Sequence, residues 1–403
     1  METKSPSHQG SIFGGVLLVS GCCIGAGMLG LPVLSAMAGF QPSIAMFLIS
    51  WLFMTCTGLL LLEVNLWFHD EVNIISMAGR TLGFLGKCVA WSLFLFLFYC
   101  LMVAYVAGSG ELCVDLFQQF SGVAISPWIG SLFFTGVLGI LLYIGTRAID
   151  HFNRLLMVGL IATYVALVIL GGSHVNGKLL EHQDWALAPL VLPVMIVSFG
   201  FHNLVPSLAT YLNRDVKRLK RTIVIGSSIP LFIYLVWEWL ILGLAPIEGP
   251  GGFRELLSEG QLATHALKSV VGISWIVNIA QYFAFFALIT SFVTVALSFV
   301  DFLIDGLQLK KKPAGRLIAC FLALTPPFLF ALMHPGVFLT ALNYAGGIGA
   351  VILFGILPAA MVWSGRYHKG LGQQKPLVPG GKAVLVLVIL FSCAVLILQA
   401  TQG

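Results

Sequence analysis

The stretch GCCIGAGMLGLP (residues 21–32) lies in the middle of the first long apolar segment of the chain. It contains four glycines and one proline within twelve positions. In a helix interior, glycine costs about 1 kcal/mol and proline about 3 kcal/mol relative to alanine. A segment long enough to cross a membrane thus carries helix breakers at its centre, and we expect this helix to be interrupted.

The composition of the whole chain is that of a membrane protein. Of its 403 residues, 59% are hydrophobic and only 9% are charged, and the mean hydropathy is +0.99. Soluble domains contain about 25% charged residues. The net charge of +5 is spread over short loops, which argues against nucleic-acid binding. We expect the lipid bilayer as the environment and no obligate protein partner. The eight cysteines lack metal-site spacing and are expected to pack as small residues.

Eleven apolar segments are long enough to span a bilayer. A hydrocarbon core of about 30 Å requires about 20 apolar residues. The segments are 11–38, 43–67, 88–117, 127–147, 152–172, 186–211, 221–245, 271–306, 315–333, 336–363 and 381–401. If the N-terminus is cytoplasmic, the loops on that side hold 18 of the 21 lysines and arginines. This excess predicts a cytoplasmic N-terminus and a C-terminus on the opposite side.

The sixth segment is interrupted in the same way as the first. Its centre, PVMIVSFGFHNLVP (193–206), has prolines near both ends, a glycine at Gly200 and the pair His202–Asn203. The two segments each open a set of five, and the sets run in opposite directions because five is odd. Matching interruptions in inverted halves indicate the binding site of a secondary transporter.

Unwound backbone survives in a membrane only where protein buries it or a cavity exposes it. Its free N–H groups suit a carboxylate, and its free carbonyls suit an ammonium group or a cation. An α-amino acid carries both charged groups. The other interpretation of these glycines is close helix packing, because small residues let membrane helices approach one another.

One connection between the spans also shows helical spacing. FRELLSEGQLATHALKSV (253–270) has apolar residues at helical intervals. It predicts an amphipathic helix at the outer mouth, either as a lid or as a loop helix without a gating role.

Several stretches resemble a known family. They are GCCIGAGMLGLP, LLLLEV (59–64), AYVAGSGEL (104–112), FNR (152–154), SFGFHNLVPS (198–207) and NYAGGIGAVILFGILP (343–358). Together they resemble the bacterial aromatic amino acid permeases, the tyrosine- and tryptophan-specific members of the hydroxy and aromatic amino acid permease family. That family belongs to the amino acid–polyamine–organocation superfamily.

The resemblance implies an all-α integral membrane protein with the LeuT-type 5+5 inverted repeat. The repeats would be residues 1–172 and 186–363, with an additional helix at 381–401. It further implies a bacterial cytoplasmic membrane location, with a periplasmic C-terminus, and ion-coupled import of tyrosine or tryptophan by alternating access. A facilitator, a symporter for another small neutral amino acid and a sensor that does not transport remain alternatives. No HExxH motif, paired mid-depth aspartates or P-loop points to an enzyme or to direct ATP drive.

The resemblance also implies a substrate site formed by both interruptions. Its predicted residues are Gly25, Ala26 and Gly27 for the carboxylate; the carbonyls of Cys23, Ser198 and Phe199 for the ammonium group; Gly200 at the break; and Phe201, His202, Tyr99 and Tyr105 for the side chain. Tyr99 and Tyr105 lie on different faces of one helix, so we expect at most one of them in the pocket.

The coupling ion is left open between H⁺ and Na⁺. Permeases of the family often have a lysine where this chain has Leu160, and its absence counts against a proton mechanism on that helix. The sodium-coupled branch of the fold implies a cation set of Gly21, Ile24, Thr290 and Ser291.

Four ionisable residues within the apolar segments call for separate consideration. Free histidine titrates near physiological pH, so His202 is either a proton carrier or a structural histidine. Glu63, Glu111 and Glu238 lie within apolar segments, where ionisable residues are costly and usually functional.

Overall fold

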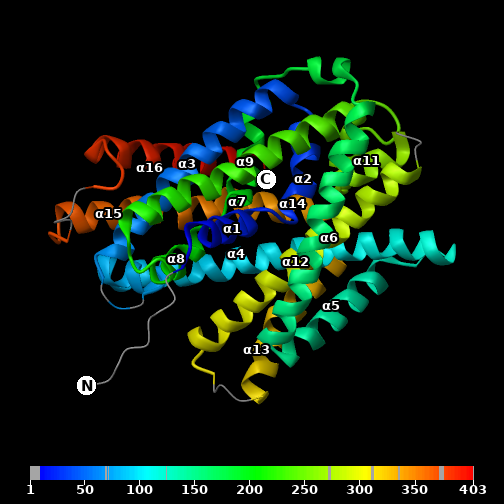
Figure 1. The fold of residues 1–403 in the computed structure, drawn as a ribbon. Helices are drawn as coiled ribbons and strands as arrows, with labels where there is room; N and C mark the ends of the chain where they lie inside the picture. The colour runs from blue at the N-terminus through cyan, green and yellow to red at the C-terminus, as the bar shows by residue number, and fades with distance from the viewer. Residues whose placement is uncertain are drawn as a thin grey trace.

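The computed structural model describes residues 10–68, 70, 72–123, 125–270, 274–309, 313–334, 336–371 and 376–402. Every regular element in these ranges is helical (Figure 1). The α-helices are α1 (Ile12–Cys23), α2 (Gly27–Ser35), α3 (Phe40–Leu66), α4 (Ile74–Ser121), α5 (Pro127–Ile144), α6 (Thr146–Gly171), α7 (Leu192–Ser198), α8 (Val205–Tyr211), α9 (Val216–Leu244), α10 (Phe253–Glu259), α11 (Ala263–Val270), α12 (Ser274–Gly306), α13 (Pro313–Met333), α14 (Phe338–Tyr344), α15 (Leu357–Tyr367) and α16 (Gly381–Gln402). The other elements are the 3₁₀ turns η1 (Gly172–His174), η2 (Gly177–Glu181), η3 (Ala188–Val191) and η4 (His202–Leu204) and the π-helix η5 (Ala345–Ile356).

The number of membrane spans agrees with the sequence. Within the described ranges, ten spans are long and apolar enough to cross a bilayer. The pair α1 and α2, bent by 56° at its break, makes an eleventh. The predicted eleven spans and the interruption of the first segment are therefore confirmed. The division into repeats at 1–172 and 186–363 stays a prediction.

Helix ends follow local chemistry. The Ser11 side chain accepts a hydrogen bond from the Gly14 N–H over 2.9 Å and so caps the start of α1. Asp215 caps α9 in the same way, and Pro127 occupies the first position of α5. A helix start leaves backbone N–H groups without partners. A serine or aspartate side chain accepts from one of them, and proline has no N–H group at that position.

The outer helices present apolar stripes to lipid. The exposed apolar residues of α6 include Leu155, Val158, Ile161, Val165 and Ile169, each 45% to 70% exposed. Their spacing of three or four residues places them on one face of a helix with 3.6 residues per turn. The helix also packs against α12. An exposed apolar stripe of this kind suits contact with hydrocarbon rather than water.

Three segment boundaries differ from the prediction. The third segment was expected at 88–117, but α4 begins at Ile74 and bends at Gly83, where φ is +80°. The fourth and fifth meet at Gly145, where φ is +125°, so a sharp bend separates α5 from α6. Glycine adopts positive φ without the steric cost that a Cβ brings. The tenth runs through α14, η5 and α15 and ends at Tyr367 rather than near residue 363.

The interrupted helices lie at the centre of the bundle (Figure 1). There α1 packs along α9, while α7 packs against η5 and α3. Around them, α12 contacts both α4 and α6. The breaks are therefore enclosed by protein, which is the condition under which unwound backbone is tolerated in a membrane.

The segment 253–270 folds as two short helices, α10 and α11, instead of one. Gly260, with φ of +69°, ends α10. The apolar residues Leu256, Leu262 and Leu267 are buried, and α11 packs on α2 and α12. The expected amphipathic face is present and covers α2. The choice between a lid and a loop helix without a gating role stays a prediction.

Candidate functional site

The first break lies between the end of α1 at Cys23 and the start of α2 at Gly27. The Ala26 N–H donates to the Ser291 hydroxyl of α12 over 2.8 Å. Among the described residues, no protein acceptor is found for the N–H groups of Gly25 and Gly27. Buried N–H groups are rarely left unpaired. Next to the N-terminus of α2, these two groups form a point that attracts an anion.

The glycines of the first break allow neighbouring side chains to come close. A Cβ on Gly27 would lie 2.7 Å from Ser198 Oγ, and one on Gly25 would collide with Ser291 Oγ. Farther along α2, a Cβ on Gly30 would meet Leu339 at 3.1 Å. The stretch therefore combines open backbone at the break with close helix packing beyond it.

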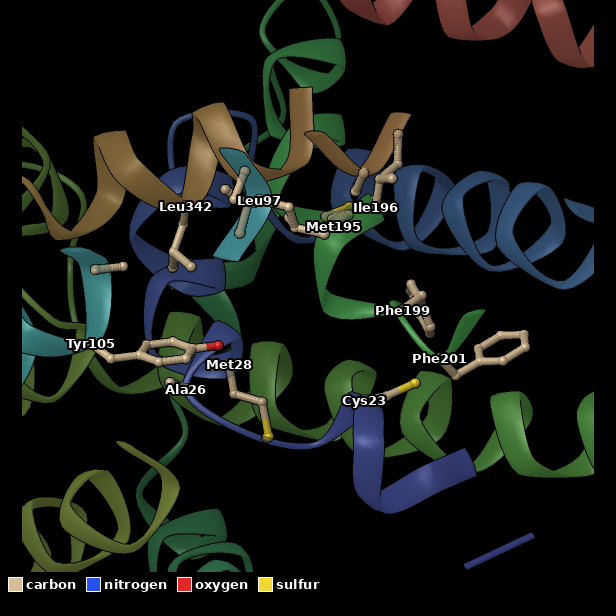
Figure 2. Close-up of a cluster of buried hydrophobic side chains, with 14 of the residues drawn as sticks. Cys23, Ala26, Met28, Leu97, Tyr105, Met195, Ile196, Phe199, Phe201 and Leu342 are labelled. Carbon is tan, nitrogen blue, oxygen red and sulfur yellow. The ribbon is translucent and has the colours of Figure 1, made fainter. Parts of the chain in front are cut away.

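The second break lies between α7 and α8. The Gly200 N–H donates to the Val197 carbonyl over 3.0 Å, so the chain turns tightly after Ser198. Cys22 Sγ lies 3.3 Å from the Gly200 carbonyl oxygen. Figure 2 shows Cys23 beside the segment that carries Phe199 and Phe201. Two segments almost 180 residues apart in the chain thus meet at their interruptions.

Tyr234 of α9 joins the two breaks. Its hydroxyl oxygen lies 2.6 Å from the Cys23 carbonyl oxygen and 2.8 Å from the Ser198 carbonyl oxygen. The side chain is fully buried, and its ring packs against Phe199 and Phe47 at centroid distances of 5.2 and 5.9 Å. Two of the three carbonyls predicted to hold an ammonium group are therefore engaged by a tyrosine hydroxyl.

A cavity of about 160 Å³ lies where the breaks meet. The predicted substrate residues that line it are Cys23, Gly25, Ala26, Gly27, Tyr105, Ser198 and Gly200. An engineered apolar cavity of about 150 Å³ accepts benzene, so this cavity has room for an aromatic ring. Tyr105 extends from α4 toward the break near Ala26 (Figure 2).

Tyr99 and Phe199 are predicted site residues that lie outside the cavity. The Tyr99 hydroxyl donates to the Leu322 carbonyl of α13 over 3.0 Å. It faces away from the cavity because six residues of helix separate it from Tyr105. Phe199 is fully buried behind the break and packs on Phe47 and Tyr234.

Phe201 and His202 also lie outside the cavity and are fully buried. His202 Nε2 is 2.9 Å from the Thr57 hydroxyl of α3. The imidazole stacks on the Phe354 ring, with centroids 4.7 Å apart, and Phe354 itself lines the cavity. His202 therefore lies one layer behind the cavity wall, and no hydrogen-bond partner for its Nδ1 is found among the described residues.

The cavity has further lining residues that sequence reasoning missed. Phe94, Phe98 and Leu101 line it together with Tyr105. Their spacing of three or four residues places all four on one face of α4. Helical spacing counted back from Tyr105 would have found them. Phe354, which also lines the cavity, gave no comparable signal, because it is one of several aromatic residues in its apolar segment.

The cavity extends toward one end of the bundle. Asn153 and Met157 in the first half of α6 line it, as do Thr294 and Ser298 in the second half of α12. These halves lie toward the end of the bundle where α9 begins, and the chain there carries Arg214, Lys217, Arg218 and Lys220. On the other side, Phe338 is fully buried, and a Cβ on Gly108 would approach its ring to 3.1 Å.

The four residues of the predicted cation set all line the same cavity: Gly21, Ile24, Thr290 and Ser291. In the described part of the chain, no backbone N–H donates to the carbonyls of Gly21 or Ile24. The Thr290 hydroxyl lies within hydrogen-bond distance of carbonyls of its own helix, 2.8 Å from that of Phe286. Carbonyl and hydroxyl oxygens are ligands that hard cations accept.

The three membrane-embedded glutamates have different surroundings. Glu63 makes two hydrogen bonds of 2.7 Å with Arg366 and also accepts the Leu377 N–H. Glu238 is fully buried, and its Oε2 lies 2.7 Å from the Ser35 hydroxyl. Glu111 lies one turn before Asp115, which contacts His265 of α11 at 2.9 Å. None of the three glutamates lines the cavity.

The sequence profile of the tryptophan/tyrosine permease family matches residues 8–399. The chain belongs to this family. The permease is 32% identical to "Tyrosine-specific transport system 1" of Haemophilus influenzae, with 93% of each chain covered. It is 31% identical to "Tryptophan-specific transport protein" of the same organism, with 99% of this chain and 97% of the relative covered. The sequence resemblance is thus confirmed, and the protein is a transporter rather than an enzyme.

The fold of the permease matches a solved structure over its whole length. The crystal structure of MhsT in complex with L-phenylalanine aligns with a TM-score of 0.66 at 15% identity, covering 100% of this chain and 99% of the other. MhsT has the LeuT fold, so the predicted fold class is confirmed. The family match and the candidate membrane spans support a multi-pass protein of the bacterial inner membrane.

Proposed function

We propose that the permease imports aromatic amino acids, tyrosine or tryptophan, together with a coupling ion, by alternating access. The observation that carries this proposal is the cavity at the meeting point of two interrupted helices, with the unpaired Gly25 and Gly27 N–H groups at its edge. The names of the relatives, and the L-phenylalanine with which MhsT was crystallised, support an aromatic substrate.

The substrate carboxylate would bind the N–H groups of Gly25 and Gly27. There the positive end of α2 adds to two free hydrogen-bond donors. The ammonium group would bind the carbonyl side of the second break, and the ring would lie against the aromatic face of α4 that includes Phe98 and Tyr105. Apolar walls with a few fixed polar groups are typical of small-molecule sites.

The cavity direction supports an inward-facing conformation. Its lining continues toward the basic end of the bundle, which the charge distribution predicts to be cytoplasmic. On the other side, Phe338 and α11 cover the site. This is the arrangement in which a carrier releases its substrate into the cell.

The coupling ion is H⁺ or Na⁺, and the two have different candidates. The cation set of Gly21, Ile24, Thr290 and Ser291 supports sodium, because two free carbonyls face the cavity there. His202 is the candidate for a proton carrier, although it stands behind the cavity wall.

The test is uptake of labelled tyrosine and tryptophan by proteoliposomes. One set of vesicles receives a sodium gradient at constant pH and another a proton gradient without sodium; protein-free vesicles are the control. Accumulation above equilibrium with one gradient supports ion-coupled import and identifies the ion. Equilibration without accumulation would mean a facilitator. Substrate binding without entry would mean a sensor, and no response to either amino acid would contradict the aromatic substrate.

A further inference from the structure

Helix α9 follows the broken first span along its length. The Ser20 hydroxyl of α1 donates to the Gly226 carbonyl over 2.8 Å, and the Trp237 ring N–H donates to the Met28 carbonyl of α2 over 2.8 Å. Between these two points Tyr234 reaches the break itself. Side chains of α9 thus contact both halves of the span, and Tyr234 also contacts the second break.

The two carbonyls at Tyr234 are the ends of two half-helices. Cys23 is the last residue of α1, and Ser198 is the last residue of α7. A helix C-terminus leaves carbonyls without partners and carries about half a negative charge. Two such ends that converge in a protein interior form a site that would attract a cation, as half-helix ends do in other transporters.

A hydroxyl group occupies this point instead. The Tyr234 oxygen is within hydrogen-bond distance of both carbonyl oxygens, and its side chain is fully buried. The rings of Phe47 and Phe199 hold the phenol in place. In the described residues, no group of three His, Cys, Asp or Glu side chains is arranged to hold a metal ion.

We propose that the Tyr234 hydroxyl takes the place of a cation between the two helix breaks and positions them as one unit. The proposal rests on the proposed transport function. Among the described residues it leaves one candidate site for a metal cation in the central cavity, formed by Gly21, Ile24, Thr290 and Ser291. Import therefore uses no more than one sodium ion per amino acid.

The first test compares two tyrosine variants in the proteoliposome assay. Tyr234→Phe removes the hydroxyl, whose single hydrogen is shared between the two carbonyl oxygens, and we expect KM for the substrate to rise at least tenfold, with a smaller change in Vmax. Tyr164→Phe is the matched control, because its hydroxyl donates to the Ile233 carbonyl of α9 over 3.0 Å and does not line the cavity. We expect less than a twofold change there. A KM for Tyr234→Phe that is unchanged or lower would overturn the proposal, since a lower value would mean that the hydroxyl only competes with the ammonium group.

The second test replaces the hydroxyl by an ion. Tyr234→Asn shortens the side chain and offers an amide oxygen, which leaves room for a hard cation with three oxygen ligands. We expect sodium, but not choline at equal ionic strength, to raise the melting temperature of this variant by several degrees more than that of the wild type, because an ion that binds only the folded state stabilises it. An equal response of both proteins would overturn the proposal.

A third measurement needs no variant. The substrate dissociation constant of the wild-type protein is measured over a range of sodium concentrations. Because bound sodium lowers Kd, log Kd falls as log sodium rises: a slope between 0 and −1 supports the proposal, and a slope near −2 overturns it. If the wild type binds no aromatic amino acid, the proposed function fails, and the melting experiment on Tyr234→Asn still decides the role of Tyr234.

Discussion

The position of Gly27 leaves no space for a side chain. Its N–H is unpaired, and Ser198 of the second break lies directly opposite. We therefore expect Gly27→Leu to abolish uptake of tyrosine and tryptophan. The new side chain would occupy the position proposed for the substrate carboxylate and push the two helix breaks apart. Membrane insertion should persist, since leucine favours a helix in a bilayer.

Gly136→Leu is the matched control for this substitution. Gly136 lies in α5, and no neighbouring atom is within 4 Å of a Cβ placed there. The measurement is uptake normalised to the amount of protein in the membrane. Normal uptake by the Gly27 variant would contradict the assignment of the first break to the substrate carboxylate.

His202 illustrates why residue type alone does not assign a role. A histidine at the centre of a membrane span suggests a proton carrier. Its neighbours are Thr57 and the Phe354 ring, and the structure places it outside the cavity. Phe354 separates the imidazole from the cavity, so a proton on His202 would not contact the substrate directly.

At the level of whole helices, a buried ion pair connects α3 to α15. Glu63 and Arg366 are each only 7% exposed and meet at 2.7 Å. Glu63→Gln removes one charge and leaves the guanidinium without its partner, which typically costs about 3–5 kcal/mol in a buried pair. We expect a clearly lower melting temperature of the detergent-solubilised protein. Melting is followed with a thiol-reactive dye or by the protein's intrinsic fluorescence.

The double variant Glu63→Gln with Arg366→Met shows whether this loss comes from the stranded charge. It removes both partners, and replacing a buried pair by uncharged groups is often close to neutral. Its stability should therefore lie nearer to that of the wild type than to that of the single variant. A double variant less stable than the single one would mean that the pair itself, rather than an unpaired arginine, sustains the contact between α3 and α15.

For the molecule as a whole, the sequence was sufficient where the membrane imposes a rule. A membrane span needs about 20 apolar residues, and lysines and arginines concentrate in the loops on one side of the membrane. The number of spans could therefore be predicted from the sequence. The two helix interruptions that form the candidate site could also be predicted, because glycine and proline within an apolar segment indicate an interrupted helix. The side chains followed only in part: whether Tyr99 or Tyr105 faces the cavity depends on how α4 is rotated in the bundle. Tyr234 had no local signal, since its role arises only when two distant breaks meet.

The direction of the cavity leads to a prediction about access from the two sides of the membrane. Cys22 lines the cavity and is exposed to it, and the cavity extends toward the basic, predicted cytoplasmic end. In a variant that keeps Cys22 as its single cysteine, a membrane-impermeant maleimide should react faster in inside-out vesicles than in right-side-out vesicles. Tyrosine or tryptophan should slow the reaction, because the substrate would occupy the space beside Gly25.

The control for this labelling is a variant that keeps only Cys393. That residue is exposed on α16, in a span whose surface would face lipid, so a water-soluble reagent should label it poorly from either side. Faster reaction of Cys22 in right-side-out vesicles would reverse the orientation taken from the charges. Equal rates from both sides, unaffected by substrate, would mean that the cavity is not a one-sided substrate pathway, because alternating access requires the site to face one compartment at a time.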